Sequence, residues 1–341
     1  MRKRIFSKGA IVSTVLALAV TVGLVLGAVG MAAAQQPIKL KYQGKWVGNI
    51  GMAWADEQRK LADRVKAKTG GRVEIELMDE VKPDNQVIDG VKSGVIDIGS
   101  QGIHARGELV VPSYLSMPFI LWDKAPEMGV RLRPLLSNFW EKTHGVHYLG
   151  LNYYLPNNLF TSRPCNSFDA LTKMKLRING TLLVQMIKSA GGSPIVMNQS
   201  EVFTSAQRGI IDGAQTAIPG YLDSGLYEVC KYMSSWPLGV MALAVTVNKD
   251  AWNKLGPELQ KQVTEAWLET EQAQLQGARN DIAGAEAKAK SLGAIRMDPP
   301  QADQDKLGSF AGPLVEDWKK KAGADAAAVM KVVNEVMGSN F

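Results

Sequence analysis

The sequence predicts an α/β fold with two lobes, because the 341-residue chain contains the same pattern twice. In each copy a helix stops at glycine, a strand follows, a second helix stops at glycine, and a further strand ends in Asp-x-Gly or Asp-Gly. The copies cover residues 70–99 and 191–213. Strands separated by helices of this length pair in parallel. Two such units in a chain long enough for two domains are expected to form lobes around a ligand-binding cleft.

The first 34 residues predict an export signal that is not part of this fold. Four basic residues precede an apolar run from Ala10 to about Met31, and three alanines follow it. This order is typical of a secretory signal peptide, with cleavage expected after Ala34. The run is also long enough to span a bilayer, so an uncleaved anchor is the alternative.

The charge of the remaining chain excludes one class of partner. The formal net charge of the whole chain is +6. Removal of the signal takes away four basic residues and no acid, which leaves 6 − 4 = +2. A nucleic-acid partner requires a basic stripe with interleaved aromatic residues, and the sequence contains none. The exported protein is therefore expected to be nearly neutral and not to bind nucleic acid.

The elements of the first unit and its continuation follow from hydrophobic periodicity and helix-stop residues. A strand leads into a long helix that ends at the first glycine pair, and the strand and helix that follow complete the unit. A proline-marked segment and another helix lead to a strand that crosses to the second lobe. The expected strands are 40–46, 73–77 and 146–153, the helices are 51–68, one from Asp84 and 127–142, and the proline-marked segment is 112–119.

The second lobe is expected to contain strands 173–178 and 194–197, helix 181–190 and a helix from Ser200, with strand 240–247 returning to the first lobe. No proline interrupts the chain between Pro257 and Gly293. This predicts a helix of about 35 residues, roughly 50 Å long, that runs along both lobes. Two helices broken at Gly277 or Gly284 are the alternative. Lobe I is then 37–154 plus 244–282, and lobe II is 155–243 plus 283–341.

The sequence predicts no catalytic residue, no metal site and no cofactor. Nucleophile-elbow and phosphate-loop motifs are absent from the sequence. His144 and His147 have a spacing that serves metals on a helix, but Gly145 between them favours a solvated turn. Cys165 and Cys230 either form a disulfide or stay two buried thiols, and we favour the thiols.

Arg177 is the most informative charged residue. Alternation along its strand puts Arg177 and Lys175 on one face and the apolar residues on the other. Arg177 lies near the carboxyl end of the strand, where open α/β sheets bind ligands, and its guanidinium can hold a carboxylate with two hydrogen bonds. A surface arginine paired with a nearby acid is the alternative.

From about residue 40 to residue 293 the sequence resembles the periplasmic solute-binding subunits of TRAP (tripartite ATP-independent periplasmic) transporters, the DctP-type family. The resemblance covers most of the chain after the signal, and it lies in seven segments in the right order. These are 61–75, 91–97, 117–119, 173–178, 207–213, 227–232 and 255–260.

The resemblance implies a type II-like periplasmic binding protein whose lobes close on an organic acid and deliver it to membrane permease subunits. In the family, the arginine of the Lys-Leu-Arg strand forms a salt bridge with the ligand carboxylate, and that role falls on Arg177. Neutral hydrogen bonds to the ligand are expected from Asn158, Gln215, Thr216 and Gln101. Tyr221 lies in a segment similar to the 2-oxoacid-binding branch and is expected to reach the ligand. Trp46 and Trp236, with Tyr153 and Tyr154, form either an apolar wall or part of the core.

Departures from the family pattern indicate the ligand class. Members that bind sialic acid have another arginine where this chain has Asn157-Asn158, and they follow Asp-Gly with Gln-Glu-Asn where this chain has Ala214-Gln215-Thr216. We therefore expect a small monocarboxylate, such as a 2-oxo, 2-hydroxy or aromatic acid, rather than a sugar acid. An exported hydrolytic enzyme on the same scaffold and a ligand-sensing partner of a membrane receptor are the alternatives. The oligomeric state is left open.

Overall fold

The structure is a computed structural model that describes residues 36–44, 52–79, 81–103 and 106–339, except for the side chains of 84, 153 and 154. The predicted export signal (1–34) and Trp46 therefore lie outside the described residues, as do the side chains of Tyr153 and Tyr154. Chain contacts separate residues Met1–Ile38 from a compact unit, Lys39–Phe341. The elements described below belong to this unit, apart from the first residue of β1.

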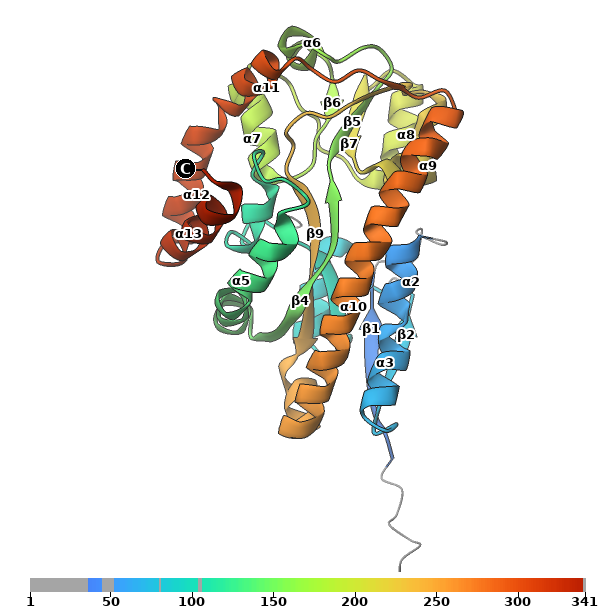
Figure 1. The fold of residues 1–341 in the computed structure, drawn as a ribbon, viewed down its shortest axis with the longest axis vertical. Helices are drawn as coiled ribbons and strands as arrows, with labels where there is room; N and C mark the ends of the chain where they lie inside the picture. Colours follow the sequence, from blue (N-terminus) through green and yellow to red (C-terminus); the bar gives the residue numbers. More distant parts are fainter. Residues whose placement is uncertain (1–35, 45–51, 80, 104–105, 340–341) are drawn as a thin grey trace, which may run out of the picture. The chain divides into compact units, whose positions relative to one another are not determined.

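Two five-stranded sheets form the framework of this unit (Figure 1). The first sheet has the order β2-β1-β3-β9-β4, and the second has the order β10-β8-β5-β7-β6. The first contains β1 (Ile38–Gln43), β2 (Val73–Met78), β3 (Ile98–Gly102), β4 (Val146–Pro156) and β9 (Val240–Asn248). The second contains β5 (Asn158–Thr161), β6 (Leu176–Arg177), β7 (Gly213–Thr216), β8 (Tyr232–Ser234) and β10 (Ile295–Arg296).

The pattern that the sequence contains twice is repeated in the structure, down to individual hydrogen bonds. In the first unit the carboxylate of Asp97 accepts from Lys41 N at 2.8 Å, and Asp97 N donates to Lys41 O at 3.0 Å. In the second unit Asp212 makes the same two bonds to Lys175, both at 2.8 Å. Each pair of bonds lies at the start of a parallel pairing, β1 with β3 and β6 with β7. The aspartate of each Asp-x-Gly or Asp-Gly segment thus fixes the register of its own unit.

Glycines and neighbouring apolar residues repeat in the same way. Gly94 and Gly209 end the second helix of each unit with φ of 73° and 70°, a region that side chains other than glycine rarely adopt. The residue after each glycine, Val95 or Ile210, is exposed, and the isoleucine that follows is buried. The two units are therefore the same turn and strand built twice.

The helices and short turns of the first half are α2 (Ala53–Arg59), α3 (Leu61–Lys68), η1 (Asp84–Gln86), α4 (Val87–Lys92), η2 (Pro112–Ser116), α5 (Ala125–Phe139) and η3 (Trp140–His144). Those of the second half are α6 (Phe168–Lys173), α7 (Thr181–Ser189), α8 (Gln199–Gln207), α9 (Ile218–Asp223) and η4 (Leu226–Glu228). The chain continues with α10 (Lys249–Ser291), α11 (Gln301–Gly308), α12 (Ala311–Ala322) and α13 (Asp325–Met337).

Three predicted elements differ from the structure. The helix expected over 51–68 is two helices, α2 and α3, that meet at Lys60. The strand expected over 173–178 is only two residues long, because α6 continues to Lys173. The strand expected over 194–197 is a single parallel bridge between Ile195 and Arg177. Short strands of this kind contain too little hydrophobic alternation to be bounded from sequence.

The long helix predicted from Pro257 is confirmed. Regular α10 geometry is interrupted at Gly256, where φ is 69°, and then continues to Ser291 without a break at Gly277 or Gly284. The helix lies along α2 and α3 and also contacts α9 (Figure 1). Two acidic residues of α10 contact α2 and α3. The carboxylate of Asp281 accepts from Ala53 N and Trp54 N at 2.9 and 3.0 Å, and Glu269 pairs with Lys68 at 2.8 Å.

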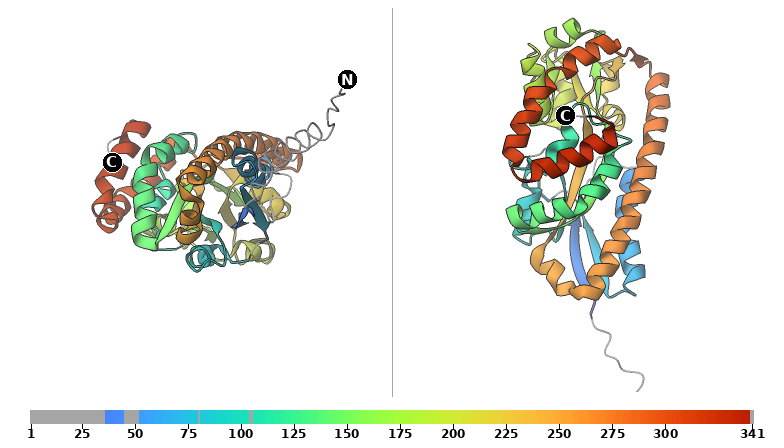
Figure 2. Two further views of the ribbon diagram at one scale, coloured as in Figure 1. Left: turned by 90° about the horizontal axis from the view of Figure 1, so that it is seen from below. Right: turned by 60° about the vertical axis from the view of Figure 1, so that its left-hand side comes forward.

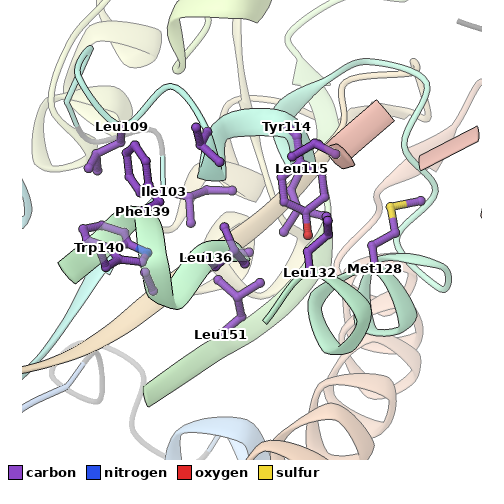
Figure 3. Packing of buried hydrophobic residues seen from close by; sticks show 14 of the residues in the cluster. Ile103, Leu109, Tyr114, Leu115, Met128, Leu132, Leu136, Phe139, Trp140 and Leu151 are labelled. Atoms are coloured by element: carbon purple, nitrogen blue, oxygen red, sulfur yellow. The ribbon is translucent and has the colours of Figure 1, made fainter. Parts of the chain in front are cut away.

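The largest hydrophobic cluster lies against the first sheet and is filled by α4, α5 and the segment around η2. Figure 3 shows Tyr114, Leu132, Phe139 and Trp140 packed together with Leu151 of β4. Helices α12 and α13 contribute to the same cluster, and Figure 2 shows them (red) beside α5 (green). The C-terminal helices thus pack with elements of the first sheet, although they follow the second sheet in sequence. The predicted division into lobes stays a prediction.

Two further clusters cover the faces of the second sheet. One contains Leu159 and Leu176 with Trp236, and the other contains Phe160 and Ala214. Adjacent residues of one strand therefore belong to opposite faces, as the two-residue period of a strand requires. In the described part of the chain, no helix is both long and apolar enough to cross a membrane.

Candidate functional site

Three predicted site residues lie together on one face of the second sheet. Asn158 pairs with Thr216 across the antiparallel strands β5 and β7, and Arg177 pairs with Ala214 across the parallel strands β6 and β7. Thr216 follows Ala214 by two residues, so Arg177, Thr216 and Asn158 project from the same face. All three are almost fully buried. We call these residues, together with Ser235, the polar row.

Ser235 joins the row by hydrogen bonding rather than by strand pairing. Its hydroxyl donates to Asn158 Oδ1 at 3.2 Å. Ser235 directly follows β8, and β8 is the neighbour of β5 in the sheet. The row therefore begins at Arg177 on β6 and crosses β7 and β5 to the end of β8.

Main-chain carbonyl groups hold Arg177 in place. Its Nε and Nη2 donate to Met197 O at 3.3 and 3.2 Å, and its Nη1 donates to Gln215 O at 3.1 Å. Of the described residues, none places a carboxylate in an ion pair with this guanidinium. A guanidinium carries five N–H groups. The three bonds above leave one N–H on each terminal nitrogen, and the two terminal nitrogens are one of the pairs through which a guanidinium can bind a carboxylate.

Burial controls the electrostatics of Arg177. The side chain is 5% exposed, and this burial lowers the pKa of the guanidinium to about 10. At neutral pH the group is still charged. A buried charge is costly unless it is paired, so an anion placed against the free N–H groups would be strongly favoured. Arg177 is therefore a buried cation for which the described residues supply no carboxylate partner.

Two other predicted contacts have mixed outcomes. Gln215 is buried beside Arg177, but its side-chain oxygen accepts from Asn179 N at 3.0 Å and so supports the turn into α7. Gln101 belongs to the first sheet, where its amide approaches Thr246 Oγ1 at 3.4 Å. Gln101 is the counterpart of Thr216 when the two units are aligned by Asp97 and Asp212.

Two aromatic residues that we expected at the ligand lie in the core instead. The Tyr221 ring stacks on Phe160 at a centroid distance of 3.9 Å, and its hydroxyl donates to Cys230 O at 2.8 Å. Trp236 Nε1 donates to Cys165 O at 2.8 Å, and its ring is buried. Because the polar groups of both residues already have main-chain partners, their role here is packing.

The other reactive candidates are also structural. Cys165 and Cys230 are buried free thiols, and burial raises the pKa of each to about 12. His144 was expected in a solvated turn, but its ring packs against Phe139 and Trp140, and burial lowers its pKa. Within the described residues, no group of three or more potential ligands is arranged to hold a metal ion.

No sequence pattern indicated the residues that contact Asn158 and its neighbour Ser235. Ser235 is 77 positions away from it, and Arg296 and Asp298 follow α10. The Arg296 guanidinium donates from Nη2 to Ser235 Oγ at 2.7 Å and from Nε to Asp298 Oδ2 at 2.7 Å. Asp298 Oδ1 accepts from Ser235 N at 2.8 Å. Only the folded sheet brings these residues together.

Two sheets with helices between their strands and a long helix that packs along both halves are the architecture of two-lobed solute-binding proteins. The chain belongs to the DctP family, described as "Bacterial extracellular solute-binding protein, family 7", which matches residues 51–321. The resemblance inferred from the seven sequence segments is thereby confirmed.

Individual relatives agree with this family. A "Solute-binding protein" of Chromohalobacter salexigens is 29% identical over 215 residues, which are 60% of this chain and 63% of that protein. The match therefore spans slightly less than two thirds of that relative.

Solved structures show the same fold. The Bordetella pertussis extracytoplasmic solute receptor DctP7, which binds pyroglutamic acid, has a TM-score of 0.77 and 23% identity, covering 86% of this chain and 98% of that one. A TRAP periplasmic solute-binding protein of Chromohalobacter salexigens with bound D-glucuronate has a TM-score of 0.76 and 21% identity, covering 89% and 99%. The predicted α/β, two-lobed architecture is confirmed by these matches.

Proposed function

We propose that this protein is the solute-binding subunit of a TRAP transporter and captures a small organic acid with one carboxylate that contacts Arg177. The observation that carries the proposal is the buried guanidinium with one free N–H on each terminal nitrogen and no carboxylate partner among the described residues. Thr216 and Asn158 lie on the same face and supply neutral hydrogen-bonding groups beside it.

Ligand binding is proposed to act through lobe closure rather than catalysis. A ligand that contacts both lobes shifts the population from open to closed. The closed protein would then deliver the acid to the membrane permease subunits. We further propose that residues 1–34 are removed on export, after Ala34, so that the protein works in the periplasm.

The ligands of the solved relatives widen the class of acids to be tested. Pyroglutamic acid and D-glucuronate each have a single carboxylate, which agrees with a single anchoring cation. D-glucuronate is a sugar acid, a class that the sequence argued against. The polar row also offers hydrogen bonds rather than an aromatic wall. Uronates therefore belong in the ligand screen beside 2-oxo, 2-hydroxy and aromatic acids.

The direct test is a thermal-shift screen of the exported form against these acids, followed by calorimetric titration of the hits. Each hit is repeated as its carboxamide, which removes the negative charge and keeps the size. We expect stabilisation by acids, little by carboxamides, and loss of binding in Arg177→Gln. An acid that binds this variant as tightly as the natural protein would overturn the anchoring role. Conversion of the bound acid into a product would instead favour an enzyme.

A further inference from the structure

The polar row ends beside an exposed cluster of charged side chains. Arg296 and Asp298 lie beside Ser235, and Arg296 also pairs with Glu286 at 3.1 Å. The side chains of Arg296 and Asp298 are 47% and 41% exposed. Exposed ion pairs of this kind contribute little to folding stability.

The hydrogen bonds that lead from Arg296 through Ser235 to Asn158 run in one direction in the structure. A guanidinium can only donate, so Ser235 Oγ must accept from Arg296 Nη2. The hydroxyl proton of Ser235 has two acceptors nearby, the Asp298 carboxylate and Asn158 Oδ1, and the structure directs it at Asn158 Oδ1 at 3.2 Å. With this arrangement the oxygen of the Asn158 amide faces the charged edge of the sheet.

The amide nitrogen of Asn158 is consequently turned away from Ser235. Its printed contact is with Pro156 O at 3.5 Å, which is too long to hold the group strongly. Along the row, the residue on the other side of Asn158 is Thr216, its cross-strand partner on β7. The NH₂ group is thus available as a donor on the side of the row that leads to Arg177.

We propose that Arg296 is a positioning residue for anion recognition: through Ser235 it fixes the Asn158 amide with its NH₂ group available to the carboxylate held by Arg177. This inference rests on the proposed function. A flipped amide would present Oδ1 to the carboxylate, and two acceptors facing each other lose the hydrogen bond and repel. The row therefore selects a ligand that presents an acceptor at Asn158, either a carboxylate oxygen or a neighbouring oxygen of the acid.

The test is a double-mutant cycle between Arg296 and Asn158 read out as ligand affinity, with pyroglutamate and D-glucuronate as probes. Arg296→Leu is expected to weaken binding about threefold to tenfold, the usual range for one hydrogen bond. In the Asn158→Ala background the same substitution is expected to change affinity less than twofold, roughly, because its target is gone. An equal loss in both backgrounds would overturn the proposal.

A second pair of variants keeps the test independent of folding. Threonine and valine have the same shape, so Ser235→Val should weaken binding more than Ser235→Thr, while both melt at similar temperatures. Lys173→Leu removes an exposed ion pair with Asp169 on α6 and serves as the control for surface charge. Equal affinities for the valine and threonine variants would contradict the role of the Ser235 hydroxyl.

The outcomes separate this inference from the proposed function. If neither these probes nor any other carboxylate binds, or if binding does not require Arg177, the proposed function fails. If binding requires Arg177 but is unaffected by Arg296→Leu and Ser235→Val, the positioning role alone is wrong.

Discussion

The first and second αβ units share the same backbone hydrogen bonds, and one buried position that is neutral in the first carries a charge in the second. When the two units are aligned by Asp97 and Asp212, Gln43 of β1 is equivalent to Arg177 of β6. Gln43 follows Lys41 by two residues, as Arg177 follows Lys175. Both side chains are buried and reach the segment that leaves the neighbouring strand. Gln43 Oε1 accepts from Val81 N and Lys82 N at 3.0 and 2.9 Å, and its Nε2 donates to Lys82 O at 2.6 Å.

The two side chains differ in what remains after these bonds. Gln43 is neutral, and main-chain groups of the protein satisfy both its side-chain oxygen and its side-chain nitrogen. Arg177 makes comparable contacts with Met197 O but retains a charge and free N–H groups. A position that is satisfied within the protein in the first unit is thus occupied by a buried cation in the second, and this cation carries the proposed anion site. The proposed specificity lies in the second unit for this reason.

The largest expected effect comes from making the second unit like the first. Arg177→Gln removes the charge and keeps a side chain that can bond to the main chain. Ligand affinity should fall by about 2–5 kcal/mol, roughly thirtyfold to several thousandfold, measured by calorimetric titration. Lys175→Gln, at an exposed position just before the same strand, is the control and should change affinity little. A large loss of ligand affinity in the control variant would contradict the specific role of Arg177.

The aspartates are expected to contribute equally to the two units. Asp97→Ala and Asp212→Ala each remove a charged acceptor from a main-chain N–H, at a cost of about 1.5–3 kcal/mol in the free energy of unfolding. Urea denaturation monitored by circular dichroism measures this cost. Asp169→Ala, at a 73% exposed site, should change stability by less than about 0.5 kcal/mol. Costs that differ severalfold between Asp97 and Asp212 would show that the frames are not equivalent.

The glycines that end the second helices provide a smaller test of the same equivalence. Gly94 and Gly209 have positive φ and no atom within about 3.4 Å of an added Cβ, so backbone strain alone opposes alanine. Each Gly→Ala variant should lose about 1 kcal/mol of stability. Gly284→Ala, within α10 and also without a nearby atom, should instead gain about 0.5–1 kcal/mol. A gain at Gly94 or Gly209 would contradict the assigned turns.

The smallest expected effect is a pH dependence that only the second unit has. Burial lowers the pKa of Arg177 to about 10, and a bound carboxylate favours the charged form and raises this pKa again. Binding is then constant below about pH 9 and weakens as pH rises through the pKa of the free protein, by about twofold at pH 10. Titration calorimetry across pH 8–11 measures this, with Lys175→Gln as the control. Affinity that stays flat to pH 11 would argue against a titrating Arg177.

Much of the fold could be predicted because local chemistry specifies it. Glycine stops, Asp-Gly segments and proline-free helical sequence identified both units and the long helix from Pro257. Strand lengths in the second sheet could not be predicted, because pairing with neighbours rather than alternation defines β6 and the bridge at Ile195.

The candidate site was predictable only in part. Arg177 was identified from its strand position and the family resemblance, and Asn158 and Thr216 lie beside it. Tyr221 and Trp236 were misplaced, because an aromatic residue has the same sequence signal in a core and in a pocket. Ser235 and Arg296 gave no signal, because their contact with Asn158 depends on the strand order of the second sheet.

The two buried thiols have a practical consequence for measuring lobe motion. Cys165 and Cys230 are the only cysteines of the chain, and with pKa values near 12 they hold almost no reactive thiolate at neutral pH. Maleimide dyes should therefore react with them very slowly. Cysteines introduced at the exposed positions Val130 and Val196 can be labelled in the otherwise natural chain. Fluorescence energy transfer between them would then test the proposed opening and closing directly, one molecule at a time.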